Sequence, residues 1–371
     1  MNGTKAVVAF YFDAGSGVGL GHAMRCAALA EAFREQGHLA LAAGPPDGAA
    51  IHLTGDLFQW RRPESGCAVD AAPERWACWL KGQGATIVII DSYRIRPETL
   101  GALRSAGLYV VYLDDHNAFP MDVQLVINAG LAAERETYRF QRAGRALLGA
   151  PYTLLRRRVV EARRLREQRE RFELQQPQQI LVTLGGGDPM GHLPRVLEAL
   201  DRVVQSGCCL EAHVIVGPYM DFPEEFKEKP WIRRHHPPTD IISMLPAMDL
   251  AVTAAGVTLQ ELLATGVPCA VVVQADNQVP AALAACQMEA ALPLFSTGPP
   301  GAPLEKGNQN ETVVLQKPLE IEEIARRLFM LLHEQKRAQA LGEMGKNIID
   351  GLGALRCCRE VLEDARRQGF R

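Results

Sequence analysis

The chain has 371 residues, more than a typical single domain contains, and its hydrophobic content of 47% can fill two separate cores. Its formal net charge of −3, with acidic and basic residues interspersed, argues against a nucleic-acid or membrane surface and favours a small ligand. The nine cysteines include no Cys-x-x-Cys pair, so we expect neither a zinc site nor disulfides but a reducing cytoplasm. The apolar run before Asp13 is too short to predict a signal peptide or a membrane span.

The first half of the chain alternates short apolar runs with segments of helical periodicity. Fully apolar runs of this length are typical of buried parallel strands. Between the first two runs, Ala28, Leu29, Ala32 and Phe33 form a one-sided apolar stripe, and Gly37 is placed to end that helix. We expect strands at residues 6–12, 39–43, 86–90, 109–113 and 125–127.

A second α/β series follows a polar segment. Residues 156–179 are rich in Arg, Glu and Gln and have too few apolar residues for a core element, which predicts a solvated helix and a linker. After it, strands are expected at residues 180–184, 213–216, 250–253 and 270–273.

The last part of the chain is predicted to be helical after one exposed loop. Residues 296–310 combine Gly, Pro and Asn, which predicts the loop, and helical patterns follow at 321–332, 338–351 and 354–367. The predicted class is α/β with two Rossmann-like domains. Their expected ranges are 1–156 and 180–350, with a linker helix at 157–179 and a C-terminal helix at 351–371.

The most informative segment lies between the first strand and its helix and reads Asp13-Ala-Gly-Ser-Gly-Val-Gly-Leu-Gly-His-Ala-Met-Arg-Cys. Its alternating glycines, which include Gly19 and Gly21, let the backbone approach a ligand closely. The spacing lacks the third glycine of a dinucleotide site, and no lysine follows as a Walker A loop requires. The turn therefore presents His22 at the carboxyl edge of a parallel sheet, where an imidazole can take a proton from water or a hydroxyl.

Alternatives stay open for two residues of this turn. His22 can instead cap the helix or pack within the turn. Arg25 is either an ordinary surface residue of the helix or an anchor for a phosphate or for Asp13. We count Gly19, Gly21, Arg25 and Asp13 as candidate substrate-binding residues.

Polar side chains also follow two other strands of the first half. Asp91 and Tyr93 come directly after the strand at 86–90, and Asp114, Asp115 and His116 follow the strand at 109–113. Because ligands of open α/β sheets bind at the carboxyl ends of the strands, these groups can converge on one pocket. Asp91 can orient His22 or hold a sugar hydroxyl, and Tyr93 can position water or the sugar. Local turn capping is the alternative for each.

Two strand ends of the second half suggest a nucleotide site. The backbone N–H groups of Gly256 and Thr258 are expected to open a helix, where these donors and the helix dipole favour a diphosphate. Glu261 lies one turn later and can accept hydrogen bonds from ribose hydroxyls, or it can form a capping box with Thr258. The candidate nucleotide-binding residues are Gly186, Gly187, Ala255, Gly256, Val257, Thr258 and Glu261.

Two amides, Asn277 and Gln278, follow the strand at 270–273. Amides at a strand end can hold sugar hydroxyl or acetamido groups without imposing a charge. Together with the glycine loops and Glu261, they indicate a nucleotide-activated sugar as the ligand.

The pattern of motifs resembles the UDP-sugar hydrolases of the pseudaminic acid pathway, and related spore-coat polysaccharide proteins share much of it. The resemblance extends over nearly the whole chain. It rests on the His22 turn, Asp91-x-Tyr93, Asp114-Asp115, Leu148-Gly-x-x-Tyr152-x-Leu-Leu-Arg156, Gly186-Gly-Asp-Pro189, Ala254-Ala-Gly-x-Thr258-x-x-Glu261, Asn277-Gln278 and Asp350-Gly-x-Gly-Ala354.

The resemblance implies a glycosyltransferase B architecture, in which two Rossmann-like domains face a central cleft. It places UDP on the C-terminal half near Glu261 and the sugar near Tyr93 and Asn277, with His22 activating water. The implied reaction is inverting hydrolysis of UDP-2,4-diacetamido-2,4,6-trideoxy-β-L-altropyranose, with no required metal or cofactor.

Two other functions remain compatible with the same residues. One is a nucleotide-sugar-dependent glycosyltransferase of surface polysaccharide or flagellin, in which a hydroxyl replaces water. The other is a non-catalytic subunit that binds a nucleotide sugar. A UDP-activated sugar is the expected partner in all three, without nucleic acid, and no oligomeric state is predicted.

Overall fold

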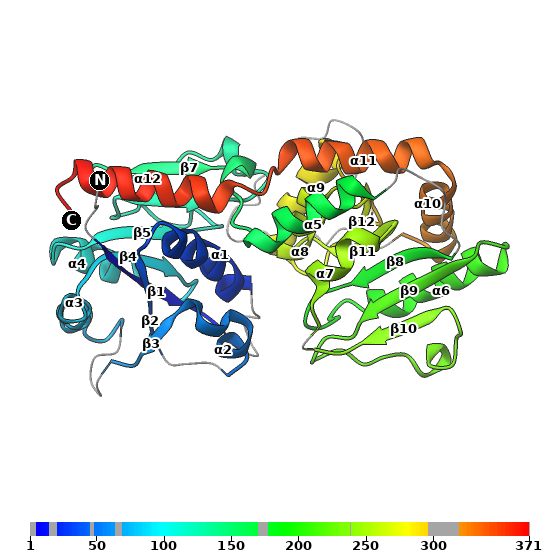
Figure 1. The fold of residues 1–371 in the computed structure, drawn as a ribbon, viewed down its shortest axis with the longest axis horizontal. Helices are drawn as coiled ribbons and strands as arrows, with labels where there is room; N and C mark the ends of the chain where they lie inside the picture. Colours follow the sequence, from blue (N-terminus) through cyan, green and yellow to red (C-terminus); the bar gives the residue numbers. More distant parts are fainter. Residues whose placement is uncertain are drawn as a thin grey trace. The chain divides into compact units, whose positions relative to one another are not determined.

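The computed structural model describes residues 5–14, 21–44, 48–63, 69–169, 177–237, 239–295 and 319–370. The chain forms two compact units, of which unit 1 comprises Met1–Arg157 with Gly351–Arg371 and unit 2 comprises Arg158–Asp350 (Figure 1). Each unit contains one parallel sheet with helices, which confirms the predicted α/β class. Gly19 and the predicted loop at 296–310 lie outside the described residues.

The sheet of unit 1 has the strand order β3-β2-β1-β4-β5-β6-β7, and every neighbouring pair is parallel. All five strands predicted for this half are present in it. The strands are β1 (Val7–Phe12), β2 (Leu39–Ala43), β3 (Gln59–Arg61), β4 (Ala85–Asp91), β5 (Tyr109–Leu113), β6 (Leu125–Asn128) and β7 (Arg145–Leu148).

Helices cover both faces of this sheet, because successive side chains of a strand point to opposite faces. Ile87 and Ile89 pack in one apolar cluster with residues of α1 and α12, whereas Val88 and Ile90 pack in another with residues of α3 and α4. The helices of unit 1 are α1 (Gly21–Glu35), α2 (Gly48–Thr54), α3 (Pro73–Gly82), α4 (Pro97–Ser105) and α12 (Gly353–Arg367). Gly37 follows α1 with a φ of +83°, as its predicted role of ending the helix requires.

The end of the chain belongs to unit 1 rather than to unit 2. Helix α12 packs on α1, and its Cys357 and Val361 are fully buried in the same cluster as Phe10. A buried hydrogen bond secures it, because the Tyr109 hydroxyl donates to Asp364 Oδ2 at 2.5 Å. Burial and Asp364 together raise the pKa of Tyr109, so the phenol keeps its proton.

We expect Tyr109→Phe to lower the free energy of unfolding by about 1–3 kcal/mol, because it removes a donor from a buried carboxylate. Urea denaturation followed by circular dichroism measures the loss. Tyr112→Phe is the matched control, since Tyr112 is also buried but donates to the neutral carbonyl of Ser92 at 3.1 Å. If Tyr109→Phe lowers the free energy of unfolding no more than the control does, the hydrogen bond to Asp364 contributes no more stability than the bond to the neutral carbonyl.

The sheet of unit 2 has the order β10-β9-β8-β11-β12-β13, again with all neighbours parallel. Its strands are β8 (Gln178–Thr183), β9 (Leu210–Ile215), β10 (Ile232–His235), β11 (Leu250–Ala254), β12 (Cys269–Val272) and β13 (Leu292–Pro293). Its helices are α5 (Arg157–Gln168), α6 (His192–Gln205), α7 (Ile241–Met244), α8 (Val257–Thr265), α9 (Val279–Gln287), α10 (Ile321–His333) and α11 (Gln335–Ile348). No helix within the described ranges is both long enough and apolar enough to cross a membrane.

Helix α5 lies in the polar segment where a solvated helix is predicted, and a small part of it is buried against the rest of unit 2. Its Val159 and Ala162 are buried. Arg166 donates to three backbone carbonyls of unit 2, those of Met248 at 2.6 Å, Gly266 at 3.1 Å and Pro246 at 3.5 Å. Burial lowers the pKa of the Arg166 guanidinium to about 10. A helix with few apolar residues can therefore be attached through long arginine side chains, which combine apolar stems with several donors.

Candidate functional site

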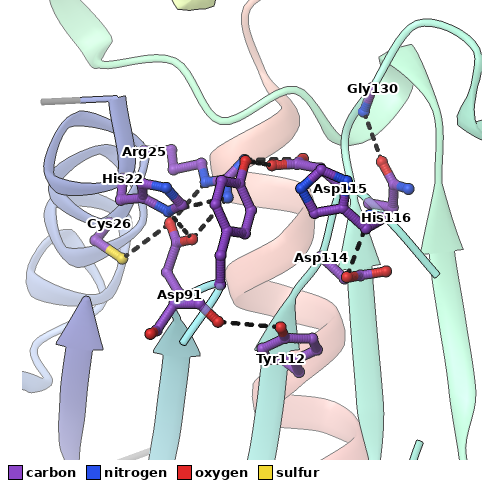
Figure 2. Close-up of polar contacts among 12 residues, drawn as sticks. His22, Arg25, Cys26, Asp91, Tyr112, Asp114, Asp115, His116 and Gly130 are labelled. Atoms are coloured by element: carbon purple, nitrogen blue, oxygen red, sulfur yellow. Dashed lines mark hydrogen bonds and ion pairs between the residues drawn. The ribbon is translucent and has the colours of Figure 1, made fainter. Parts of the chain in front are cut away.

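Polar side chains from three segments of unit 1 meet at the carboxyl edge of its sheet (Figure 2). His22 lies in the first turn of α1, which follows β1; Asp91 is the last residue of β4; and Asp115 follows β5. Because β1, β4 and β5 are adjacent in the sheet, their ends bring these residues together. Arg25, one turn after His22 on α1, lies among them in Figure 2.

Asp91 is the centre of the cluster and is fully buried. Its Oδ1 contacts His22 Nδ1 and accepts a hydrogen bond from Arg25 Nη2 at 2.6 Å, and its Oδ2 accepts from Arg25 Nε at 2.6 Å. The Cys26 thiol lies 3.7 Å from the same Oδ2. Burial alone raises the pKa of Asp91, but the charge and hydrogen bonds of Arg25, with the bond from His22, outweigh it and lower the pKa to about 2. The carboxylate is therefore ionised except in strong acid.

The ionised Asp91 determines the tautomer of a neutral His22. A carboxylate without a proton can only accept, so the contact requires the proton of His22 to be on Nδ1. Arg25 Nη2 also lies 3.3 Å from Nδ1, but a protonated Nδ1 cannot accept from it. The Nε2 atom then carries the lone pair, which is the arrangement of a base oriented by a carboxylate.

Arg25 connects this pair to a second carboxylate. Its Nη1 donates to both oxygens of Asp115, at 2.9 and 2.7 Å, so its guanidinium is shared by Asp91 and Asp115. Both carboxylates raise the pKa of Arg25 well above its ordinary value, although burial opposes them. Asp13, the partner considered for Arg25 from the sequence, instead accepts a hydrogen bond from the Ser92 hydroxyl at 2.9 Å.

Asp115 stands with Asp114 at the predicted strand end, and it is Asp115 that faces the site, although the sequence assigned it no role. The Asp114 carboxylate is buried and accepts from the backbone N–H of Asn117 at 2.7 Å and from the Tyr138 hydroxyl at 2.5 Å. It holds its own turn, which is the local capping role given as its alternative. The signal for Asp115 was the doubled aspartate at a strand end, which does not reveal which carboxylate faces the site.

Tyr93 presents its ring rather than its hydroxyl. The hydroxyl donates to Asp115 Oδ2 at 2.6 Å, and burial together with Asp115 raises the pKa of Tyr93. The ring packs edge-on against His22 and His116, with centroid distances of 4.5 and 4.6 Å. Tyr93 is 43% exposed, so it offers accessible aromatic surface at the cluster. In the described part of the chain, no three His, Cys, Asp or Glu side chains are arranged to hold a metal ion.

In unit 2, the turn between β11 and α8 is open at its glycine. Gly256 is exposed, its φ of −98° suits any residue, and a Cβ there would meet no atom within 4 Å. The helix begins at Val257 with Gly256 as its N-cap, so the alternative of a capping box with Thr258 as N-cap is wrong. Glu261 follows one turn later and is 8% exposed.

The other candidates of unit 2 lie at the same carboxyl edge of its sheet. Gly186 and Gly187 follow β8, and the φ of +96° at Gly185 fits the left-handed turn that begins there. Asn277 is exposed. Gln278 uses its side-chain oxygen within its own turn, where it accepts from the Gln274 N–H at 3.1 Å.

No family model matches this chain. The chain is 22% identical over 370 residues to the spore coat polysaccharide biosynthesis protein SpsG of Bacillus subtilis, covering 97% of this chain and 99% of that protein. Among solved structures, a glycosyltransferase from Rickettsia africae superposes with a TM-score of 0.60 at 12% identity, covering 97% of this chain and 99% of that one. S. aureus MnaA, solved with UDP, superposes with a TM-score of 0.58 at 8% identity, covering 99% and 98%.

The protein has the glycosyltransferase B fold. The two parallel sheets of seven and six strands are those of this architecture, which confirms the fold expected from the motifs. Identities this low establish the fold alone, because one architecture serves many reactions.

Proposed function

We propose that the protein is a nucleotide-sugar-dependent glycosyltransferase in which His22 is the general base. The observation that carries the proposal is the buried His22 and Asp91 pair, which leaves a lone pair on Nε2 at the carboxyl edge of the unit 1 sheet. The shared fold with a glycosyltransferase and with a protein solved with UDP supports this function, as does the likeness to SpsG over nearly its whole length.

The proposed reaction is a direct displacement at the anomeric carbon of the sugar. The acceptor hydroxyl gives its proton to His22 Nε2 as its oxygen forms a bond to that carbon. The bond from the anomeric carbon to the β-phosphate oxygen breaks at the same time, and UDP leaves. The configuration at the anomeric carbon is inverted in the product. Asp91 stabilises the imidazolium that forms.

We assign the nucleotide to unit 2. The backbone N–H groups of Gly256, Val257 and Thr258 open α8, where they and the helix dipole stabilise the charge that develops on the leaving diphosphate. The empty space beside Gly256 suits this role, because a side chain there would occupy the volume a phosphate needs. Glu261 would accept from the ribose hydroxyls, and Asn277 would hold the sugar.

Hydrolysis is the second candidate, and the order of motifs from the His22 turn to Asp350-Gly-x-Gly-Ala354 favours it. The same residues would serve, with water in place of the acceptor hydroxyl. Under this alternative His22 activates water, and the products are UDP and the free sugar. A non-catalytic subunit would bind the same UDP-sugar without releasing UDP.

We expect UDP release from a UDP-sugar to rise at least about tenfold when an acceptor is added, because a transferase excludes water from the activated carbon. The assay uses UDP-N-acetylglucosamine and UDP-linked diacetamido sugars, each with and without a mixture of oligosaccharides. Mass spectrometry identifies the products, and ³¹P spectra identify the nucleotide.

The outcomes separate the three functions. If UDP is released at the same rate with and without oligosaccharide, and free sugar is the other product, the protein is a hydrolase and not a transferase. If calorimetry shows that a UDP-sugar binds but no UDP is released, both enzymatic functions are wrong and the protein is a non-catalytic binding subunit.

A further inference from the structure

Tyr219 is the most exposed large hydrophobic or aromatic side chain in the described part of the chain, at 64%. It lies beyond the end of β9, at the carboxyl edge of the unit 2 sheet. An aromatic ring left in water at the edge where α/β sheets bind their ligands is a candidate contact surface. None of the steps proposed above uses it.

The backbone under this ring is fixed to the glycine turn after β8. The Tyr219 N–H donates to the carbonyl of Gly186 at 2.9 Å, and Tyr219 pairs with Gly187 in an isolated parallel bridge. Gly217 lets the two turns approach closely, because a Cβ there would lie 2.6 Å from the Gly185 carbonyl oxygen. The backbone that carries the ring is therefore already held in place before a ligand binds.

The strand order places Tyr219 relative to the proposed ligand, and the inference therefore rests on the proposed function. Along the edge, Tyr219 follows β9, Gly256 follows β11, and Asn277 follows β12. Since β8 separates β9 from β11, Tyr219 is about 10 Å to one side of the β11 end, while Asn277 is on the other side. With the diphosphate at Gly256 and the sugar at Asn277, the nucleoside extends toward β9.

We propose that the Tyr219 ring stacks on the nucleobase of the UDP-sugar. Every base has an uncharged π-face that an exposed aromatic ring can cover, and the phenolic hydroxyl can stay in water meanwhile. The contact adds affinity for the nucleoside and takes no part in breaking the glycosidic bond. Tyr219 is therefore a binding residue, distinct from the base at His22.

The test compares ligands with and without the base, using Tyr219→Ala, Tyr219→Phe and the wild type in calorimetry. UDP should bind Tyr219→Ala about 5- to 100-fold more weakly, whereas Tyr219→Phe should bind it within about twofold of the wild type. Ribose 5-diphosphate, which lacks the base, should bind all three equally. Phe329→Ala is the matched control, because Phe329 is another exposed aromatic residue of unit 2, on α10, and its loss should change neither affinity.

Two results would overturn the assignment while leaving the proposed function intact. One is equal UDP affinity of Tyr219→Ala and the wild type. The other is an equal loss of affinity for UDP and for ribose 5-diphosphate in Tyr219→Ala. That result would mean that Tyr219 maintains the shape of the turn and does not contact the nucleobase. If the wild type binds neither ligand, the nucleotide-dependent function fails and the stacking contact fails with it.

Discussion

His22→Gln is expected to lower the rate of UDP release about 10²- to 10⁴-fold while leaving the affinity for UDP unchanged. Glutamine keeps a polar group near Asp91 but has no basic nitrogen to accept the acceptor's proton, and general-base catalysis contributes a factor of this size. The UDP contacts are assigned to unit 2, so binding should survive. Steady-state kinetics with a UDP-sugar and an acceptor, beside calorimetry with UDP, measure both quantities.

His38→Gln is the control for this change. His38 is also a buried histidine of unit 1, but its Nδ1 accepts from the backbone N–H of Ala6 at 3.1 Å, away from the Asp91 cluster. Its replacement should leave turnover within a few-fold of the wild type. Turnover by His22→Gln within tenfold of the wild type would show that another group accepts the proton.

Arg25→Met is expected to destabilise the protein by about 3–5 kcal/mol, the usual cost of leaving one partner of a buried ion pair uncompensated. Asp91 is fully buried, and Arg25 supplies two of its hydrogen bonds and its nearby positive charge. Chemical denaturation at pH 7 measures the loss. Arg25→Met combined with Asp91→Asn should recover part of it, because the double variant buries no unpaired charge at Asp91.

The stability that Arg25→Met loses should depend on pH. In the wild type the pKa of Asp91 is about 2, below the value of about 3.9 of an unfolded aspartate. Its ionised form therefore adds stability that is complete above about pH 4 and is lost as the pH falls toward 2. Without Arg25, burial raises the pKa of Asp91, so the folded variant takes up a proton more readily than the unfolded chain does. The stability deficit of Arg25→Met relative to the wild type should therefore be largest at neutral pH and narrow as the pH falls and Asp91 is protonated.

Arg142→Met provides the comparison for an exposed pair. Arg142 is 44% exposed and pairs with Asp122 at 2.7 Å. Its loss should cost no more than about 1 kcal/mol. Equal effects of Arg25→Met and Arg142→Met would contradict the central place of Arg25 in the cluster.

The sequence predicted the central strands of both sheets and missed the edges. Strand β5 is buried along its whole length and therefore reads as an apolar run. The four edge strands β3, β7, β10 and β13 were not predicted. Strand β3, Gln59–Arg61, has two exposed residues of its three, and β13 is only two residues long. An edge strand has one neighbour and a partly solvated face, so its sequence need not be apolar.

The candidate site divides in the same way. The glycines before His22 and the strand end at Asp91 are local patterns, and the sequence was sufficient to select both residues. Choosing Asp115 over Asp114 required the backbone after β5, where Asn117 at a φ of +50° and Tyr138 hold the Asp114 carboxylate away from Arg25. Two adjacent residues of one type carry no local signal for the direction of each side chain.

Local periodicity by itself determined that this protein has two parallel α/β units and a histidine turn after its first strand. It did not determine that α12 belongs to unit 1, where Tyr109 donates to Asp364 across 255 positions of sequence. It also left open that Arg25 holds two carboxylates, one at the end of β4 and one just after β5. Only the tertiary structure decided these features, because each depends on which distant segments become neighbours, and the hydrophobic pattern of one segment does not encode that.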